Sequence, residues 1–382
     1  MKVMIIVTHL LGTGHLSRAL TLGRAFAEDG DGGDVMVVSG GMPAPQLDSG
    51  GVTLFGLPPL RSDGTDFTRL LTDQNDVADD RYKAARVTAL TQAVQSFQPQ
   101  VLITELYPFG RRSLASEFDT ALTTARNLDQ RPIILGSIRD ILAPPSKPSK
   151  ATRADDIIEQ FYDGILVHSN QSLTPLSVSW PVSAKLAARL HYTGFVAPEP
   201  PQPHPEDIGA HEVLVSAGGG SVGQPIFRAA IEAARKMPNR RWRLLVGGQD
   251  AKRRIAELSE LAQGTAVSLE PVRPDFRQML PHAAASISMC GYNTALDILQ
   301  IGTPAVFVPF DDGKEVEQGL RAHSLSELPA IEVLTSQNLT GERLANALER
   351  VISDGPRGPQ IQGFDGAQQT VEVTKRLLEK RR

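Results

Sequence analysis

Residues 286–310 read S-I-S-M-C-G-Y-N-T-A-L-D-I-L-Q-I-G-T-P-A-V-F-V-P-F, and this stretch predicts a compact βαβ unit. Ser286 to Met289 is a short apolar strand, and Ala305 to Phe310 is a second, buried strand. Between them, Asn293 and Thr294 are cap-type residues that open a helix. Two apolar strands joined by a helix within so few residues indicate a parallel α/β sheet.

The turns and the one charge of this stretch indicate a ligand site. Gly291 lets the backbone approach a ligand closely, and Gly302 followed by Pro304 ends the helix in the order that helix C-termini prefer. In parallel α/β sheets, ligands bind outside the carboxyl ends of the strands, where helix N-termini point. Asp297, the only charge of the helix, is either a surface residue favoured by the helix dipole or an acceptor for a ribose or sugar hydroxyl.

Length and composition exclude several classes of protein. The chain has 382 residues, more than one ordinary core holds, so two domains are expected. A net charge of −4 argues against a nucleic-acid partner, and the single cysteine, Cys290, excludes an internal disulfide and a cysteine-based zinc site. No apolar run reaches about 18 residues, and the N-terminus predicts a first strand, not a signal peptide. We therefore expect a cytoplasmic protein, at most peripheral at the inner face of the membrane.

A proline-dense segment divides the chain. It reads A-P-E-P-P-Q-P-H-P-E-D-I-G-A-H-E, and proline stiffens a connector while blocking helix and sheet. On each side of it the chain opens with a strand, a glycine loop and a helix, which predicts an α/β fold of two Rossmann-like doubly wound domains facing a cleft. The predicted segments are an N-terminal domain at 1–196, the linker at 197–212, a C-terminal domain at 213–366, and a closing helix at 367–382 that is expected to pack toward the N-terminal domain.

The first glycine loop, L-L-G-T-G-H, contains Gly12, Thr13 and Gly14 and precedes a helix. Free N–H groups at such a helix start bind anions, although the loop lacks the G-x-G-x-x-G dinucleotide pattern. His15 lies at the helix N-terminus, where the dipole lowers an imidazole pKa and keeps the ring neutral. His15 is therefore either a general base or a histidine that only hydrogen-bonds the loop. His9, at the end of the first strand, is the second histidine candidate.

A second group of polar residues follows the strand V-L-I-T-E-L at 101–106. Glu105 lies near its carboxyl end, and Arg111 and Arg112 follow closely. These residues form an ion pair, or they hold an anionic acceptor.

The second glycine loop opens the C-terminal domain after a strand at 213–216. Gly219, Gly220, Ser221 and Gly223 precede a helix and describe an anion cradle. The loop is not a Walker loop, because no G-K-[ST] follows it.

Taken together, these motifs resemble the GT-B nucleotide-sugar glycosyltransferases of family 28, the MurG-like enzymes. In that family a G-T-G-G-H loop faces the acceptor, and G-T-G-H stands here, one glycine shorter. The family's G-G-S-x-G loop cradles the donor diphosphate, and the second glycine loop matches it. The pattern G-x-x-T-x-x-E-x-x-x-x-G-x-P is matched from Gly291 to Pro304, with Asp297 in place of the ribose-binding Glu. The resemblance covers the C-terminal half well and the N-terminal half only at its first loop and helix.

Further site residues are implied by the resemblance. The family has a Q-Q pair that contacts the donor sugar, and Glu317-Gln318 stands in its place. The backbone that contacts uracil falls near Val272. Gly291, Asn293, Thr294 and Asp297 would complete the nucleoside side of the site.

The resemblance implies an inverting, metal-independent glycosyltransferase with no cofactor. A hexose or N-acetylhexosamine would pass from a nucleoside-diphosphate donor, UDP by preference, to an acceptor hydroxyl on a lipid, a cell-envelope glycan or a small molecule. The base would be His15, with Glu105 as the second choice. The N–H groups of Gly219 to Ser221 would stabilise the leaving diphosphate.

Three alternatives remain from the sequence. G-x-G-H-x-x-R, from Gly12 to Arg18, also resembles the UDP-sugar hydrolases of the pseudaminic pathway, in which water replaces the acceptor. A UDP-sugar 2-epimerase would share the GT-B architecture, and a non-catalytic sugar-nucleotide-binding subunit would need a membrane partner. The closing Lys-Arg-Arg is a solvated helix end or a weak contact to anionic lipid. The sequence does not indicate the oligomeric state.

Overall fold

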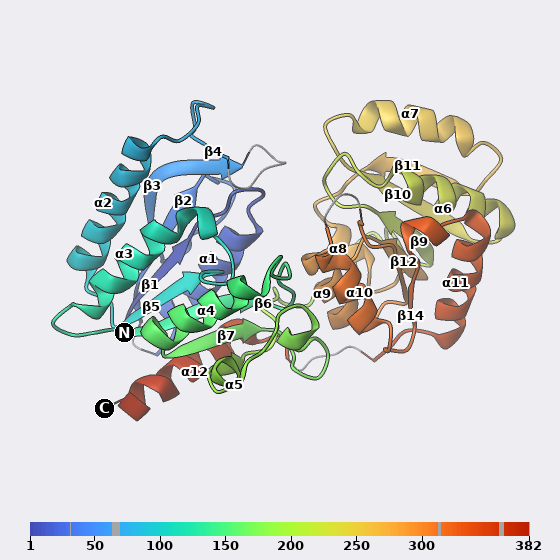
Figure 1. Ribbon diagram of the computed structural model, residues 1–382. Coiled ribbons are helices and arrows are strands. Elements are labelled where there is room, and N and C mark those ends of the chain that lie inside the picture. The colour runs from blue at the N-terminus through green and yellow to red at the C-terminus, as the bar shows by residue number, and fades with distance from the viewer. Residues whose placement is uncertain (31, 63–68, 312–314, 359–362, 382) are drawn as a thin grey trace. The chain divides into compact units, whose positions relative to one another are not determined.

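The computed structural model describes residues 1–30, 32–62, 69–311, 315–358 and 363–381. The chain forms two compact units (Figure 1). Unit 1 comprises Met1–Val196 together with Asp365–Arg382, and unit 2 comprises Ala197–Phe364. Each unit contains its own parallel sheet, which confirms the predicted α/β class.

Unit 1 is built on an eight-stranded sheet in the order β4-β3-β2-β1-β5-β6-β7-β8. All neighbouring strands are parallel except β3 and β4, which pair antiparallel. The strands are β1 (Lys2–Val7), β2 (Asp34–Gly41), β3 (Thr53–Ser62), β4 (Leu70–Leu71), β5 (Val101–Glu105), β6 (Ile133–Arg139), β7 (Gly164–His168) and β8 (Leu190–Tyr192).

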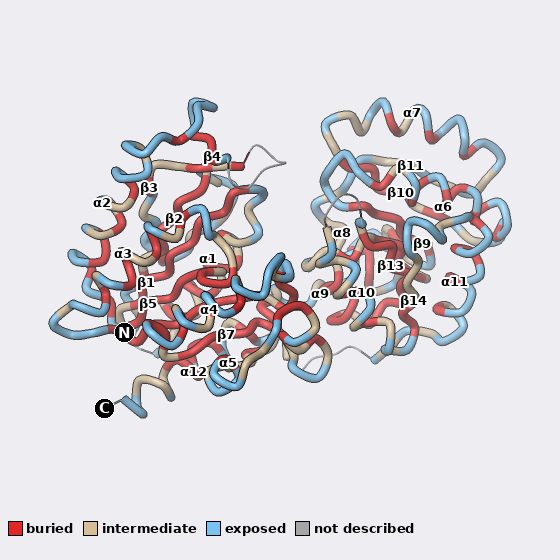
Figure 2. Tube along the Cα trace, in the orientation of Figure 1, coloured by how far each residue is buried: buried red, intermediate tan, exposed pale blue. Residues whose placement is uncertain are grey.

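Helices cover both faces of this sheet because successive strand residues point to opposite sides. Met4 and Ile6 of β1 join the core beneath α2, α3 and α4, whereas Val3 and Ile5 join the core beneath α1 and α12. Figure 2 shows the strands as a nearly continuous buried layer. The helices are α1 (Gly14–Ala27), α2 (Asp80–Phe97), α3 (Ala115–Arg126), α4 (Pro148–Phe161), α5 (Ala184–Ala187) and α12 (Gly366–Arg381), with 3-10 turns η1 (Arg112–Leu114) and η2 (Leu176–Val178).

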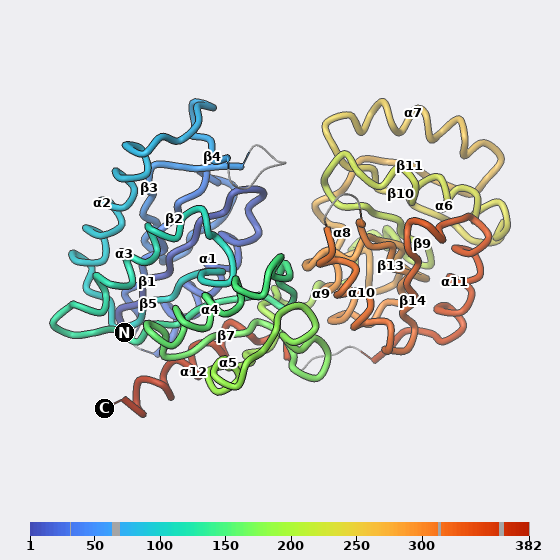
Figure 3. The backbone as a smooth tube through the Cα atoms, viewed as in Figure 1, coloured from blue at the N-terminus to red at the C-terminus, as the bar shows by residue number. Residues whose placement is uncertain are grey.

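The last helix of the chain belongs to unit 1. Figure 3 shows α12, in red, beside the green segments α5 and β7 of unit 1. Lys375 Nζ lies 2.7 Å from Asp29 Oδ1, and Val371 is buried in the same core as Leu20 of α1. Near its end, Arg381 donates a hydrogen bond of 2.7 Å to the carbonyl of Pro132.

Unit 2 has a six-stranded parallel sheet in the order β11-β10-β9-β12-β13-β14. Apolar residues of α6, α7 and α11 pack against one face of it. The strands are β9 (Glu212–Ser216), β10 (Arg241–Val246), β11 (Val267–Pro271), β12 (Ala285–Ser288), β13 (Ala305–Phe307) and β14 (Ile331–Val333). The helices are α6 (Gln224–Lys236), α7 (Ala251–Leu261), α8 (Phe276–Met279), α9 (Tyr292–Ile301), α10 (Glu317–Leu325) and α11 (Gly341–Asp354), with the 3-10 turn η3 (Ser336–Asn338).

The strand orders locate one switch point in each sheet. In unit 1 the chain leaves β1 toward β2 on one side and returns to β5 on the other. In unit 2 it leaves β9 toward β10 and returns to β12. Ligands of doubly wound sheets bind in the crevice outside the carboxyl ends of the strands at such a point. The loops after β1 and β5, and those after β9 and β12, are therefore the places to look for chemistry.

The βαβ unit at 286–310 forms, with two corrections. The helix α9 begins at Tyr292 with Gly291 as its N-cap, and no side chain caps it. Asn293 and Thr294 therefore lie inside the first turn and do not cap the helix as predicted. The second strand ends at Phe307 and not at Phe310, because β14, its outer neighbour, pairs only as far as that residue. Gly302 ends the helix with φ of 85°, a left-handed conformation that favours glycine.

The proline-dense segment at 197–212 is not a detached linker. It belongs to unit 2 and lies against α8 and α9. Gln300 donates to the carbonyl of Pro198 (3.0 Å), Arg277 donates to that of Glu199 (3.1 Å), and the N–H of His204 donates to the carbonyl of Gln278 (2.9 Å). Side-chain and backbone donors thus satisfy carbonyls that have no sheet partner.

Candidate functional site

The switch point of unit 1 brings together His15 and Glu105, which are 90 residues apart. His15 is the second residue of α1, just after the loop that follows β1, and Glu105 is the last residue of β5. His15 Nδ1 lies 2.8 Å from Glu105 Oε1, and Arg18 Nη2 lies 2.5 Å from the same oxygen. Arg18 stands one turn after His15, so both side chains reach Glu105 from one face of the helix.

The charges of this cluster follow from burial and from neighbouring groups. Burial alone would raise the pKa of Glu105, but His15, Arg18 and Arg111 together hold this pKa well below its usual range. Burial lowers the pKa of His15 more than Glu105 raises it. At neutral pH, Glu105 is therefore an anion and His15 is neutral. The predicted neutral imidazole agrees with this direction, and burial is the largest cause of the lowered pKa.

These charges decide the tautomer of His15. An ionised carboxylate only accepts hydrogen bonds, so Nδ1 of His15 carries the proton and donates to Glu105. Arg18 Nη2, at 3.4 Å from Nδ1, is then a second donor and makes no hydrogen bond with the ring. Nε2 keeps its lone pair, and about a fifth of the side chain, 21%, is exposed. A neutral, oriented and accessible imidazole nitrogen has the properties of a general base.

His9, the second histidine candidate, is packed differently. Its Nε2 donates to the carbonyl of Met42 (3.0 Å), and the ring is 4% exposed. A Cβ on Gly41 would lie 2.5 Å from Nδ1 of His9, so glycine in β2 is what leaves space for the ring. His9 therefore fills the space between β1 and β2, and Nε2 of His15 is the more accessible base.

The first loop lies beside this cluster. Gly12 and Gly14 are exposed, and Gly12 has φ of 52°, in the left-handed region. Thr13 is the N-cap of α1 and makes no side-chain capping bond. Across the switch point, Arg111 precedes η1 and acts electrostatically on Glu105, whereas Arg112 is exposed and donates to the carbonyl of Phe109 (3.1 Å).

The switch point of unit 2 contains the second glycine loop. Gly219, Gly220 and Ser221 are exposed between β9 and α6, and Gly223 is buried with φ of 84°. None of the hydrogen bonds found within the described residues uses the N–H groups of Gly219, Gly220 or Ser221. The Ser221 hydroxyl donates to Asp250 (2.8 Å). Exposed N–H groups before a helix of 13 residues describe an anion site.

Sequence reasoning missed the residues that shape this loop from behind. Arg254 of α7 is 4% exposed, and it donates to the carbonyls of Gly247 (2.9 Å) and Val222 (2.8 Å). A Cβ on Gly247 would lie 2.2 Å from the carbonyl oxygen of Gly218. The only sequence signal was G-G-Q-D directly after β10, at 247–250.

If the loop holds the diphosphate that the sequence resemblance implies, Gly247→Ala should weaken UDP binding by about 10- to 100-fold, which corresponds to losing one charge-assisted hydrogen bond of about 1.5–3 kcal/mol. The added methyl meets backbone atoms, so the Gly218–Gly219 segment must move. Isothermal titration with UDP measures the change. Gly56→Ala is the matched control, because a Cβ there meets no atom within 4 Å. UDP binding as tight as that of the control would show that this loop does not hold the nucleotide.

Asp297, the predicted ribose ligand, is 7% exposed and is not a free surface acid. Its Oδ1 accepts a hydrogen bond of 2.6 Å from Nε of Arg277. Burial raises the pKa of Asp297 more than Arg277 lowers it. No hydrogen bond among the described residues reaches Oδ2, so this oxygen remains for a hydroxyl donor. Asn293 is exposed and Thr294 is half-buried in the first turn of the same helix.

The other predicted donor-site residues are distributed over two loops. Val272 is exposed after β11, and its N–H already donates to the carbonyl of Val246 (3.2 Å). A base would therefore be contacted through the carbonyl of Val272. Glu317 and Gln318 open α10, and Gln318 Oε1 accepts from the N–H of Phe310 (3.1 Å). This bond holds Gln318 beside the end of β13 and leaves its amide N–H groups for a sugar hydroxyl.

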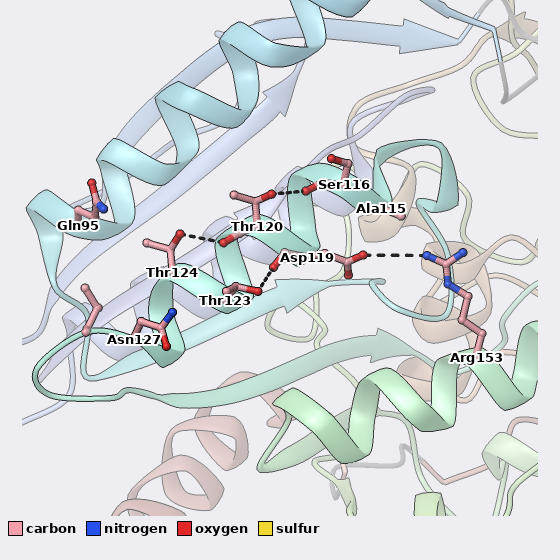
Figure 4. A pocket seen from close by; sticks show the side chains of 10 residues that line it. Gln95, Ala115, Ser116, Asp119, Thr120, Thr123, Thr124, Asn127 and Arg153 are labelled. Atoms are coloured by element: carbon pink, nitrogen blue, oxygen red, sulfur yellow. Dashed lines mark hydrogen bonds and ion pairs between the residues drawn. The ribbon is translucent and has the colours of Figure 1, made fainter.

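An open groove of about 690 Å³ lies elsewhere in unit 1, along α3 (Figure 4). The hydroxyls of Thr120, Thr123 and Thr124 donate to carbonyls one turn earlier, so they are not aimed at a ligand. Neither His15 nor Glu105 lines the groove, and we assign it no chemistry. The lining residues are Gln95, Ala115, Ser116, Asp119, Thr120, Thr123, Thr124, Asn127, Leu128 and Arg153.

Neither a metal-binding cluster nor a membrane-spanning helix is found among the described residues. They contain no cluster of three or more His, Cys, Asp or Glu side chains arranged to hold a metal ion. No helix in that part of the chain combines the length and the apolar character needed to cross a bilayer.

Comparison with known proteins assigns the C-terminal half. Residues 214–371 match the glycosyltransferase family 28 C-terminal domain. A 143-residue segment is 33% identical to a protein of Brucella anthropi named UDP-N-acetylglucosamine--N-acetylmuramyl-(pentapeptide) pyrophosphoryl-undecaprenol N-acetylglucosamine transferase. The alignment covers 36% of this chain and 38% of that relative, so it says nothing about the remainder of either protein.

Solved structures extend the similarity to the whole fold. Acinetobacter baumannii MurG superposes with a TM-score of 0.63 at 14% identity, covering 98% of this chain and 100% of that chain. A putative UDP-N-acetylglucosamine 2-epimerase from Listeria monocytogenes gives 0.61 at 13% identity, covering 99% and 97%. The fold is therefore shared by transferases and by a protein named as an epimerase. The resemblance seen in the sequence is confirmed at the level of these findings: the chain has the GT-B fold, and its residues 214–371 match the glycosyltransferase family 28 C-terminal domain.

Proposed function

We propose that the chain is an inverting, metal-independent glycosyltransferase. It transfers a hexose or N-acetylhexosamine from a UDP-sugar to an acceptor hydroxyl, on a lipid or a cell-envelope glycan. The observation that carries the proposal is the His15–Glu105 hydrogen bond at the switch point of unit 1, in a chain whose residues 214–371 match the family 28 C-terminal domain. The family 28 match supports the donor, and the buried pair supports the chemistry.

The base acts in unit 1. Nε2 of His15 takes the proton of the acceptor hydroxyl as its oxygen attacks the anomeric carbon. The resulting imidazolium is stabilised by Glu105, which is already ionised and bonded to Nδ1. Glu105 itself is 1% exposed, and its Oε1 already accepts hydrogen bonds from both His15 and Arg18. Glu105 therefore orients His15 and does not serve as the base.

The leaving group is held in unit 2. Charge develops on the diphosphate as the glycosidic bond breaks, and the N–H groups of Gly219 to Ser221 and the start of α6 are oriented to stabilise it. Asp297 Oδ2 accepts from the ribose, and Gln318 donates to the sugar. Fixed N–H dipoles need little reorganisation during the reaction.

The choice of UDP rests on the Brucella relative, whose name specifies a UDP-sugar donor and a pyrophosphoryl-undecaprenol acceptor. The donor half is the part that aligns with this relative. The acceptor half does not align, and the acceptor is therefore assigned only as a hydroxyl on a lipid or envelope glycan.

UDP is expected to stabilise the protein more than GDP or dTDP does. A ligand at 100 times its dissociation constant adds about 2.7 kcal/mol to the free energy of unfolding, which a thermal-shift measurement detects. The same screen with UDP-glucose and UDP-N-acetylglucosamine ranks the sugar. If no nucleoside diphosphate and no nucleotide sugar shifts the transition, the donor site is wrongly assigned.

Hydrolysis and transfer differ in whether the release of UDP depends on an acceptor. The same base would activate water in a hydrolase, so UDP release is measured from the preferred donor with and without candidate acceptors. A transferase releases UDP slowly alone and faster with its acceptor. Release at full rate without any acceptor would favour the hydrolase, and interconversion of two UDP-sugars would favour the epimerase.

A further inference from the structure

The turn at 106–112, between β5 and η1, is held rigidly. The N–H of Leu106 donates to the carbonyl of Ser137 (2.8 Å), and that of Gly110 donates to the carbonyl of Leu106 (2.8 Å). The Thr104 hydroxyl donates to the carbonyl of Tyr107 (3.1 Å). The Tyr107 ring stacks on Phe118 of α3 at 4.7 Å. Backbone and side chains therefore both fix the path of this turn.

Two residues of the turn have left-handed backbone conformations although neither is glycine. Leu106 has φ of 67° and Arg111 has φ of 58°. Such conformations cost about 1–3 kcal/mol each and persist where the surroundings enforce them, often at functional sites. Asn tolerates this region far better than Arg, yet Arg stands at 111. An arginine in this backbone conformation therefore indicates that its side chain has a role.

Arg111 has no partner that would explain its place. Its Nε–H is buried and donates to no acceptor within the described residues, and the buried Oε2 of Glu105 accepts from no donor there. The two groups are close enough to interact electrostatically but do not bond each other. The other carboxylate oxygen, Oε1, is already bonded by His15 and Arg18. Arg111 is therefore not needed to fix Glu105, and buried unpaired groups at one place call for a ligand.

We propose that Arg111 binds an oxyanion of the acceptor, so that the acceptor carries a carboxylate or phosphate close to its reacting hydroxyl. This inference rests on the proposed function, because it assumes that His15 faces the acceptor. Arg111 lies beside His15 and Glu105, so the anion it holds and the hydroxyl that His15 deprotonates belong to the same end of one molecule. The planar guanidinium fork matches a carboxylate or phosphate in a bidentate manner.

Anion titrations test the site directly, with UDP present at saturation to fill the donor loop. Glucuronate, inorganic phosphate and neutral glucose are titrated into the wild type, Arg111→Asn and Arg126→Gln. Asn keeps the left-handed backbone and removes the charge, so the turn is preserved. Arg126 is the matched control, because it is an exposed arginine at the far end of α3.

At least one of the two anions should bind the wild type and Arg126→Gln with equal affinity. The same anion should bind Arg111→Asn about tenfold or more weakly, which is the loss expected for a charge-assisted contact. Glucose should bind no more tightly to the wild type than to Arg111→Asn. The anion that binds tighter identifies a carboxylate or a phosphate acceptor. The proposal is wrong if neither anion binds the wild type, or if Arg111→Asn binds both as tightly as the control does.

A failure of the Arg111 proposal can be distinguished from a failure of the proposed donor site. Binding of UDP itself is measured first in all three proteins. If UDP does not bind, the proposed function fails, and the titrations without UDP still report whether Arg111 holds an anion. If UDP binds equally to all three proteins but glucuronate and phosphate bind no more tightly than neutral glucose does, only the proposed role of Arg111 is wrong.

Discussion

His15→Ala is expected to lower kcat by about 10²- to 10⁴-fold, the usual contribution of a general base. The dissociation constant of UDP should not change, because His15 belongs to unit 1 and the donor residues to unit 2. Initial rates of UDP release in the presence of acceptor, with UDP affinity measured in parallel, separate the two effects. His282→Ala removes an exposed histidine of unit 2 and is the control for general effects of the substitution.

The pH profile gives the same hypothesis a second test. The base must be unprotonated, and burial lowers the pKa of His15 below its usual value of 6.5. The rate should therefore rise with pH through an acid limb whose midpoint lies below 6.5, and should be level above it. Glu105→Gln removes the charge that raises the pKa of His15, so the limb should move to still lower pH.

The rate of Glu105→Gln should fall at every pH, although the limb moves. A neutral amide can donate to Nδ1 as well as accept from it, so the tautomer with a free Nε2 is no longer enforced. An unchanged kcat in His15→Ala would exclude His15 as the base. A limb that stays in place in Glu105→Gln would show that the two residues are not coupled.

The sequence was most informative where the signal is local. The strand, glycine loop and helix from Val213 to Lys236 are contiguous, and the loop between strand and helix could be predicted from Gly219 to Gly223 alone. Gly247 and Arg254 shape that loop from another strand and helix, about 30 residues later. Nothing near the loop in sequence indicates them, because their contact depends on β10 lying beside β9.

The same limit explains what could be predicted of the His15–Glu105 pair. His15 and Glu105 were each singled out by their position at the end of a strand. Their hydrogen bond could not be predicted, because it depends on β5 pairing with β1 on the side opposite to β2. Asp297 is a similar case: the acid was predicted, but its ion pair with Arg277 of α8 was not, since it joins two helices that pack only after folding.

Arg86→Met is expected to destabilise unit 1 by about 3–5 kcal/mol, the loss typical when one member of a buried ion pair is removed. Arg86 is 0% exposed, and its Nε and Nη2 bond the carboxylate of Glu117 at 2.8 and 2.9 Å. Its Nη1 donates to the carbonyls of Gly40 (3.0 Å) and Pro58. The substitution leaves an unpaired carboxylate and two unpaired carbonyls in the interior.

The two units need separate probes, because a two-unit chain need not unfold in one step. The chain has two tryptophans, Trp180 in unit 1 and Trp242 in unit 2. In a Trp242→Phe background, fluorescence during urea unfolding reports on unit 1 alone. Lys185→Ala is the control, because it breaks a largely exposed pair with Glu159 in the same unit and should cost little stability.

The double variant Arg86→Met with Glu117→Met distinguishes a buried charge from lost packing. If the damage in Arg86→Met comes from the unpaired carboxylate, removing that carboxylate should restore part of the stability, because buried ion pairs are often replaceable by apolar residues. Recovery should stay incomplete, since the carbonyls of Gly40 and Pro58 remain without their donor. A double variant as unstable as the single one would show that these carbonyl bonds, and not the ion pair, are what Arg86 contributes. A Cβ on Gly40 would lie 2.5 Å from Nη2 of Arg86, so glycine at this position of β2 leaves the space that the guanidinium fills.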